Sequence, residues 1–226
     1  RQACTYYTKL VATNYTGISS HEFEQAFQKD PLSAQVLDDY GIAKADRLDW
    51  GHLAHPDQDV KTDKAFQKLM LAYLEHDIAE AKRGNKTSPF ASAMDTLREL
   101  RTNIRKVITY KLISDEDYAK DILGGFNSFN SFLAVGQPIL RLEQLLALIK
   151  AGIVEILGPK LQLETNQDHF VTYSKRFPEH KIEINDVIEA RLASVDIRIS
   201  TNPLIQDLLK TGMARPYELH LNDGST

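Results

Sequence analysis

Apolar side chains recur every three and four residues from Ser19 to about Ala151, which is the spacing of one face of an α-helix. The clearest stretch predicts a long amphipathic helix at 62–83, closed by Gly84 because glycine readily adopts a left-handed helix cap. Ser88 followed by Pro89 predicts the start of another helix. Further helices are predicted at 20–30, 32–41, from 115 onward and at 139–151, with a loop at 50–57 and an irregular segment at 124–132.

After Gly152 the apolar spacing changes from about 3.6 residues to two, which indicates strands. Strands are predicted at 153–157, 160–164, 169–173, 181–185 and 186–190, with turns at 165–168 and at Pro178-Glu179. Short strands with short turns are typical of an antiparallel meander. A last helix is predicted from Pro203 to Gly212. The predicted fold class is α+β: a mainly helical region at 1–151, then a small antiparallel β-meander and a final helix at 152–226.

Composition is typical of a folded chain of ordinary polarity. The chain has 226 residues, of which 42% are hydrophobic and 26% charged, and its net charge of -4 disfavours nucleic acid and anionic membranes as partners. The longest apolar run, at 69–74, is far shorter than the ~20 residues that span a bilayer. Cys4 is the single cysteine, so no internal disulfide forms, and a cytoplasmic location is expected.

The sequence lacks the common motifs for binding nucleotides. None of the 11 glycines has another glycine two positions later, as a dinucleotide-binding loop requires, and none precedes a lysine, as a P-loop requires. The first residues, Arg1 to Thr5, include neither an initiator methionine nor the apolar core of a signal peptide. We therefore expect a piece of a longer polypeptide that holds no cofactor by itself.

One group of residues has side chains of the kind that bind metals. His52 and His55 are three residues apart, with Asp57 and Asp59 close by, and imidazole and carboxylate groups ligate metal ions. Such loose spacing is common by chance, so a solvated or capping role is favoured and no metal site is predicted.

Arginines are the most suggestive candidates for binding. Arg98, Arg101 and Arg105 fall on one flank of a predicted helix, where three guanidinium groups could hold a phosphate or carboxylate. The alternative, favoured on spacing alone, is a solvated flank paired with acids such as Asp95. Arg141 lies at a helix start, where its charge opposes the helix dipole, so a partner outside the helix is expected.

Three segments together resemble the middle region of bacterial FAD-NAD(P)-binding proteins. They are YLEHDIAEA with GN at 73–85, SPF with AMDTLRELRTNIR at 88–105, and GQPILRLEQLLALIKAG leading into ILGP at 136–159. The similarity extends from about Leu37 to Leu219. The sequence departs from the wider flavoprotein pattern at Ala190-Arg191-Leu192, where Ala-x-Gly is common, and at Gly136-Gln137-Pro138, where Gly-Pro-Pro is usual.

The resemblance implies a fragment of an FAD/NAD(P)-dependent oxidoreductase that shapes the substrate or cofactor cleft. Members of that family carry the FAD fingerprint in an N-terminal part and complete the FAD domain in a last part, and both parts are missing here. The partners would be these missing nucleotide-binding portions, with FAD and possibly NAD(P) in the parent protein. The resemblance also makes Arg98, Arg101, Arg105 and Arg141 candidate ligands for a cofactor or substrate.

A second interpretation is a non-catalytic helical module that binds a protein partner. An exposed aromatic patch at Phe126, Phe129 and Phe132 would favour it. The competing and favoured reading is that these rings pack into the core.

Overall fold

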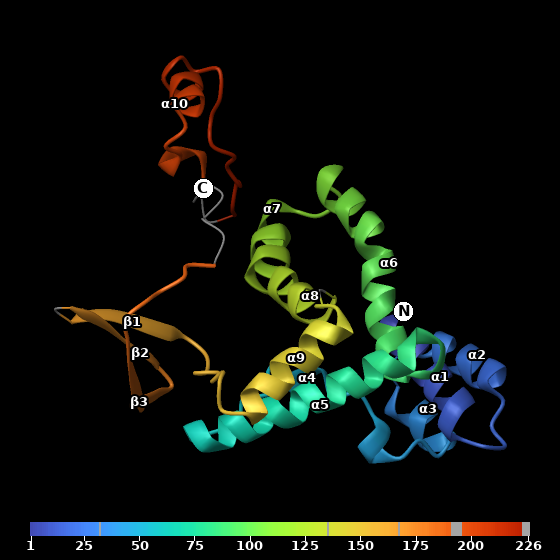
Figure 1. The fold of residues 1–226 in the computed structure, drawn as a ribbon. Coiled ribbons are helices and arrows are strands. Elements are labelled where there is room, and N and C mark those ends of the chain that lie inside the picture. The colour runs from blue at the N-terminus through green and yellow to red at the C-terminus, as the bar shows by residue number, and fades with distance from the viewer. Residues whose placement is uncertain (32, 135, 167, 191–195, 223–226) are drawn as a thin grey trace.

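The computed structural model describes residues 1–31, 33–134, 136–166, 168–190 and 196–222. It confirms the α+β class, with a helical first part, a three-stranded antiparallel sheet and a final helix (Figure 1). The helices are α1 Gln2–Asn14, α2 Ser20–Lys29, α3 Ala34–Asp39, α4 Trp50–Ala54, α5 Asp63–Thr87, α6 Pro89–Thr109, α7 Asp115–Asp117, the π-helix Tyr118–Phe126, α8 Asn127–Ala134, α9 Ile139–Lys150 and α10 Pro203–Lys210. The strands are β1 Leu161–Asn166, β2 His169–Ser174 and β3 Phe177–Ile184.

The largest buried cluster lies where α1 packs against α2, and it includes a helix that the sequence analysis missed. Tyr7 of α1 is buried against Phe23 and Phe27 of α2. The ring centroids of Phe23 and Phe27 lie 5.8 Å apart, and those of Tyr7 and Phe27 lie 5.4 Å apart. The predictions placed the first helix after Ser19, but Gln2–Asn14 is helical and also packs on α6. The helix is stabilised by this tertiary burial, because its own apolar periodicity is weak.

Side-chain caps set the starts of α5 and α6, and the cap at Ser88 was predicted. Thr62 Oγ1 accepts a hydrogen bond from the amide of Ala65, and Ser88 Oγ accepts one from the amide of Ala91 at 2.9 Å. Gly84, with φ 68° and ψ 170°, interrupts the helical geometry where the closing glycine was predicted. The chain therefore changes direction between α5 and α6 at a conformation that only glycine adopts easily.

Two segments predicted as irregular are helical. Part of the 50–57 segment forms α4, capped by Asp49, whose carboxylate accepts a hydrogen bond from the amide of His52. The 124–132 segment forms the end of the π-helix and most of α8. Its glycines suggested a break, but Phe126 and Phe129 continue an apolar stripe that is partly buried, and this packing overrides the low helix propensity of glycine.

The β-meander was predicted correctly in order and direction, but not in every boundary. The strands pair antiparallel in the order β1-β2-β3, with Leu161 opposite Ser174 and Phe170 opposite Ile184. The turn between β2 and β3 lies at Lys175-Arg176, whereas Pro178 belongs to β3, because an edge strand tolerates the missing N–H of proline. Asn166 and His169 flank the first turn, in which position 167 lies outside the described residues.

Two further predicted strands, at 153–157 and 186–190, are not strands. The apolar pattern was present, but within the part of the chain that the structure describes no strand pairs with either segment. The carbonyl of Ile156 instead accepts a hydrogen bond from Gln67 of α5. The Ala-x-Gly comparison at 190–192 falls on residues 191 and 192, which lie outside the described residues.

The meander attaches to the N-terminal end of α5 through one charged and one aromatic contact. Arg176 donates hydrogen bonds to the carboxylate of Asp57 at 2.6 Å and to three backbone carbonyls in the segment before α5. Phe177 is fully buried, and its ring centroid lies 5.7 Å from that of Phe66. These contacts connect segments that are more than a hundred residues apart in the sequence.

The last described segment extends away from the helical region as α10 and then returns (Figure 1). The amides of His220 and Asn222 donate hydrogen bonds to the carboxylates of Asp115 and Glu116 in α7. Over the described residues, no single helix is long and apolar enough to cross a bilayer, and the helical segment 115–134 and α9 reach that composition only as a pair bent by 89°.

Candidate functional site

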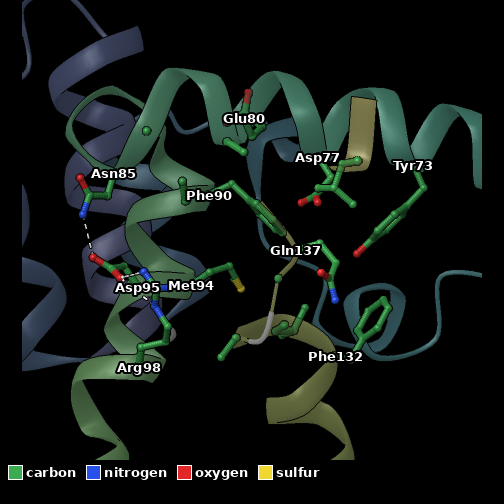
Figure 2. Close-up of a pocket in the computed structure, with 17 residues that line it drawn as sticks. Tyr73, Asp77, Glu80, Asn85, Phe90, Met94, Asp95, Arg98, Phe132 and Gln137 are labelled. Atoms are coloured by element: carbon green, nitrogen blue, oxygen red, sulfur yellow. Dashed lines mark hydrogen bonds and ion pairs between the residues drawn. The ribbon is translucent and has the colours of Figure 1, made fainter. Parts of the chain in front are cut away.

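A pocket of about 370 Å³ lies between α5, the first half of α6, the end of α8 and the segment before α9. Figure 2 shows polar and aromatic side chains from all of these elements directed toward it. The break at Gly84 contributes to it, because α6 leaves the end of α5 in a new direction and contacts both α5 and α8 (Figure 1). The polar and aromatic side chains that line the pocket include Tyr73, Asp77, Glu80, Asn85, Asp95, Arg98, Phe132 and Gln137.

One end of the pocket is a network around Asp95. Arg98 donates hydrogen bonds to Asp95 Oδ1 from Nε at 3.1 Å and from Nη2 at 2.6 Å, and Asn85 donates to Oδ2 at 2.7 Å. The hydrogen bonds from Arg98 and, to a smaller extent, from Asn85 lower the pKa of Asp95. The Nη1 group of Arg98 is not used by Asp95, so it can still donate to an anion in the pocket.

Glu80 is held by the start of α6. Its Oε2 accepts a hydrogen bond from Ser88 Oγ at 2.5 Å, and its Oε1 accepts one from Arg83 at 2.8 Å. Burial alone would raise the pKa of Glu80, but the bonds from Ser88 and Arg83 together hold it below its usual range. Both carboxylate oxygens are occupied, so Glu80 shapes the wall and is a poor candidate for binding a ligand.

Asp77 differs from the other two acids in the wall. Among the residues that the structure describes, it has no hydrogen-bond or ion-pair partner. Burial raises its pKa, against a smaller opposing effect of the neighbouring His76. A half-buried carboxylate without a protein partner can accept a proton or a cationic group from a ligand.

The opposite end of the pocket is aromatic and amide-lined. The rings of Tyr73 and Phe132 lie 6.0 Å apart at an interplanar angle of 32°. Figure 2 places the Gln137 side chain between them and Asp77. Burial and, to a smaller extent, the negative charge of Asp77 raise the pKa of Tyr73. Its hydroxyl therefore stays protonated and can donate a hydrogen bond.

The structure does not bring the four candidate arginines to one place. Arg98 lines the pocket but is paired with Asp95, as the charged-flank interpretation predicts. Arg101 and Arg105 line a separate hollow of about 180 Å³ farther along α6. Arg141 lies in the first turn of α9, exposed, and donates to Gln144 at 2.8 Å. Their role as ligands therefore stays a prediction.

The sequence analysis missed Asp77, Tyr73 and Gln137 as pocket residues. All three lie in segments that carry the family resemblance, but nothing in their spacing indicates that α5 and the segment before α9 face one another. A larger hollow of about 730 Å³ lies beside Arg1–Thr5, against Phe27 and Trp50.

The residues weighed as metal ligands do not form a cluster in the part of the structure described. Asp57 is bound by Arg176, and His52 lies within α4 with its amide capped by Asp49.

The described residues do not fit the pyrophosphate of a dinucleotide. Such a site needs a parallel strand, a glycine-rich loop and a helix N-terminus, and every strand pairing described here is antiparallel. No glycine in the sequence has another glycine two positions later, so the described residues contain no glycine-rich loop of the kind that binds a pyrophosphate.

Comparison with known proteins adds a reaction class. The chain is 32% identical to the L-aspartate N-monooxygenase (nitrosuccinate-forming) of Streptomyces davaonensis, over 97% of this chain and 35% of that protein. It is similar to part of an oxidoreductase. Identity is 33% to the nitrosuccinic acid synthase of Aspergillus oryzae, over 94% of this chain and 33% of that protein. A third relative, the L-aspartate N-monooxygenase (nitrosuccinate-forming) of Streptomyces cremeus, is 32% identical over 96% of this chain and 34% of that protein.

The chain thus spans about a third of the length of the curated relatives it matches. No protein-family model matches it. The relatives' names give a substrate and an oxidation, whereas FAD and NAD(P) stay predictions from the sequence resemblance.

Proposed function

We propose that this chain forms the substrate-facing part of a flavin-dependent N-monooxygenase that oxidises the amino group of a small acidic amino acid such as L-aspartate. The observation that carries the proposal is the match to three nitrosuccinate-forming proteins over nearly all of this chain. FAD and NAD(P) would be held by portions of the polypeptide outside these residues, and those portions are the proposed partners. The redox chemistry is that of these cofactors, and this chain supplies position and electrostatics.

The pocket has groups that complement the ammonium and one of the two carboxylates of such a substrate. L-Aspartate carries one ammonium group and two carboxylates. Asp77 has a free carboxylate to receive the ammonium, and its raised pKa suits it to take the ammonium proton, because an amine must lose that proton before its lone pair can react. Arg98 Nη1 would bind one substrate carboxylate, with Asp95 fixing the guanidinium plane.

The remaining arginines have separate proposed roles. Arg101 and Arg105 share a hollow on α6, and Arg141 is exposed at the start of α9. They are proposed as cofactor contacts from the family resemblance together with this exposure.

Exposed apolar side chains support the presence of further portions of the polypeptide. Ile188 is 92% exposed, Met213 78% and Ile153 72%, and all of them lie in the last third of the chain. Large apolar groups left in water mark surfaces that another element covers. The relatives are about three times as long as this chain, which supplies chain to cover them.

The test is to express the full reading frame that contains this chain. We expect a yellow protein with flavin absorbance, NAD(P)H oxidation dependent on L-aspartate, and nitrosuccinate as product. Asp77→Asn is expected to lower kcat/KM for L-aspartate by about a hundredfold with unchanged flavin content. Arg98→Gln is expected to raise KM by about tenfold or more, since a charged hydrogen bond to the substrate is lost.

The matched control is Asp121→Asn, an exposed acid in the π-helix outside the pocket, which should leave both constants unchanged. Flavin binding without oxidation of L-aspartate would reject L-aspartate as the substrate and support the proposed flavin cofactor. Absence of both flavin and a thermal shift with FAD would reject the proposal and favour the non-catalytic module. Of the aromatic patch that would favour that alternative, Phe126 and Phe129 are partly buried, whereas Phe132 is 48% exposed and lines the pocket.

A further inference from the structure

Three potential metal-binding side chains meet where the meander packs on α5, away from the pocket. Asp63 lies in the first turn of α5, Glu155 in the segment after α9, and His180 in β3. One ligand atom from each lies within 4.8 Å of the other two. His180 Nε2 is 2.7 Å from Glu155 Oε1, and His180 Nδ1 is 4.0 Å from Asp63 Oδ2.

Asp63 has an oxygen that the described residues leave unsatisfied. Its Oδ1 is fully buried and has no hydrogen-bond partner, and the side chain as a whole is 16% exposed. A buried carboxylate oxygen without a hydrogen-bond partner is costly, so a water molecule, a ligand or an ion is expected beside it. The other oxygen, Oδ2, is the one that lies 4.0 Å from His180 Nδ1. With His180 neutral, the two carboxylates give the cluster a charge that a divalent cation would balance.

We propose that Asp63, Glu155 and His180 bind a divalent transition-metal ion of the zinc class. One imidazole nitrogen and carboxylate oxygens are ordinary ligands for Zn²⁺ at about 2.0–2.2 Å. Tetrahedral ligands at that distance lie about 3.4 Å from each other, and one ligand atom from each of the three side chains lies within 4.8 Å of the others. The contacts to Glu155 and Asp63 involve different ring nitrogens of His180, so only one of these nitrogens binds the ion. The ion replaces the proton shared by His180 and Glu155, and water completes its coordination.

The role of this site is to fasten three elements together. It would join α5, the segment before β1 and β3 at one point, next to the contacts of Arg176 and Phe177. Asp63 and Asp77 are 14 positions apart on α5, which corresponds to about 20 Å along the helix. The metal is therefore separate from the pocket, and its binding is independent of the proposed monooxygenase function.

The test uses the 226-residue chain, treated with a chelator and titrated with ZnCl₂ by calorimetry. We expect one equivalent to bind with micromolar or tighter affinity and to raise the thermal midpoint. A Co²⁺ titration should give the visible absorption of a site with nitrogen and oxygen ligands. His180→Gln and Asp63→Asn should each weaken binding by about tenfold or more.

Matched controls are His55→Gln and Asp59→Asn, which change the same residue types at exposed positions and should leave binding unchanged. Circular dichroism checks the fold of every variant. If His180→Gln or Asp63→Asn does not fold, Glu155→Gln is the second variant, because its side chain is 44% exposed and bears less of the packing. Absence of stoichiometric Zn²⁺ binding, or binding that survives in the folded ligand variants, would overturn the proposal and leave a proton-bridged triad.

Discussion

Arg176 shows how one side chain can fix the position of a whole sheet. Its guanidinium donates to the carboxylate of Asp57 and to the carbonyls of Asp57, Gln58 and Val60, at distances from 2.6 to 2.9 Å. The fork of donors satisfies several backbone groups of a segment that has no regular structure after α4. The stability of the meander's attachment to α5 therefore depends on the geometry of this group as well as on its charge.

We predict that Arg176→Ala lowers the free energy of unfolding by about 2–3 kcal/mol, because it leaves one carboxylate and three carbonyls without their donor. Arg176→Lys should recover only part of this loss, since a lysine keeps the charge without the planar fork. Urea unfolding measures both. Arg198→Ala is the control, because within the part of the chain that the structure describes Arg198 pairs with nearby Asp196 on the surface, and its loss should be small. Equal losses for Arg176→Ala and Arg198→Ala would contradict the prediction.

At the scale of elements, the pocket depends on the break between α5 and α6. Gly84 lies in this break and in the pocket wall, at φ 68° and ψ 170°. This region of backbone space is nearly restricted to glycine. The cap formed by Ser88, Pro89 and the hydrogen bond to Glu80 then starts α6 in its new direction. Local sequence chemistry therefore determines the turn that brings the pocket walls together.

Gly84→Ala is predicted to destabilise the protein by about 1–3 kcal/mol through backbone strain alone. No atom lies within 4 Å of the Cβ that alanine would add, so a steric clash does not contribute. Chemical unfolding gives the value, and Gly125→Ala is the matched control. Gly125 also has open space around it and does not have positive φ, so alanine there should be neutral or stabilising. A neutral Gly84→Ala would show that the break relaxes without cost.

At the scale of the whole molecule, the helical first part and the last third differ in how well they bury apolar groups. The cluster of α1, α2 and α3 contains Tyr7, Phe23, Phe27 and Leu37, all nearly inaccessible to water. In contrast, Ile188, Leu204 and Met213 are largely exposed in the segments after the meander. Under the proposed function, those segments contact the nucleotide-binding portions of the longer polypeptide.

Hydrogen exchange can test that arrangement. In the full reading frame, amides at 186–190 and in α10 are expected to exchange more slowly than in the 226-residue chain, because contact with other portions would exclude water. Amides of α1 serve as the internal reference and should exchange alike in both proteins, since its apolar face packs on other helices within this chain. Identical exchange at 186–190 and α10 would reject these contacts.

The sequence by itself determined the elements whose cause is local. Capping residues and periodic apolar spacing placed α5, α6 and α9, and alternating residues with short turns placed the meander. The same reasoning failed where long-range packing decides. Helix α1 forms because it packs on α2 and α6, the π-helix forms despite Gly124 and Gly125, and 186–190 has no partner strand in the described residues.

Only the tertiary structure decided which chemical groups meet. Asp77 became a candidate because the turn at Gly84 and the approach of Gln137 enclose it, and burial then raises its pKa. The spacing of Arg98, Arg101 and Arg105 correctly placed them on α6, yet the fold sends Arg98 to one pocket and the other two to another. Asp63 and His180 lie more than a hundred positions apart, so no motif could reveal them. Spacing along a chain reports the face of an element, whereas a site requires two elements to approach, and that depends on the packing of the whole chain.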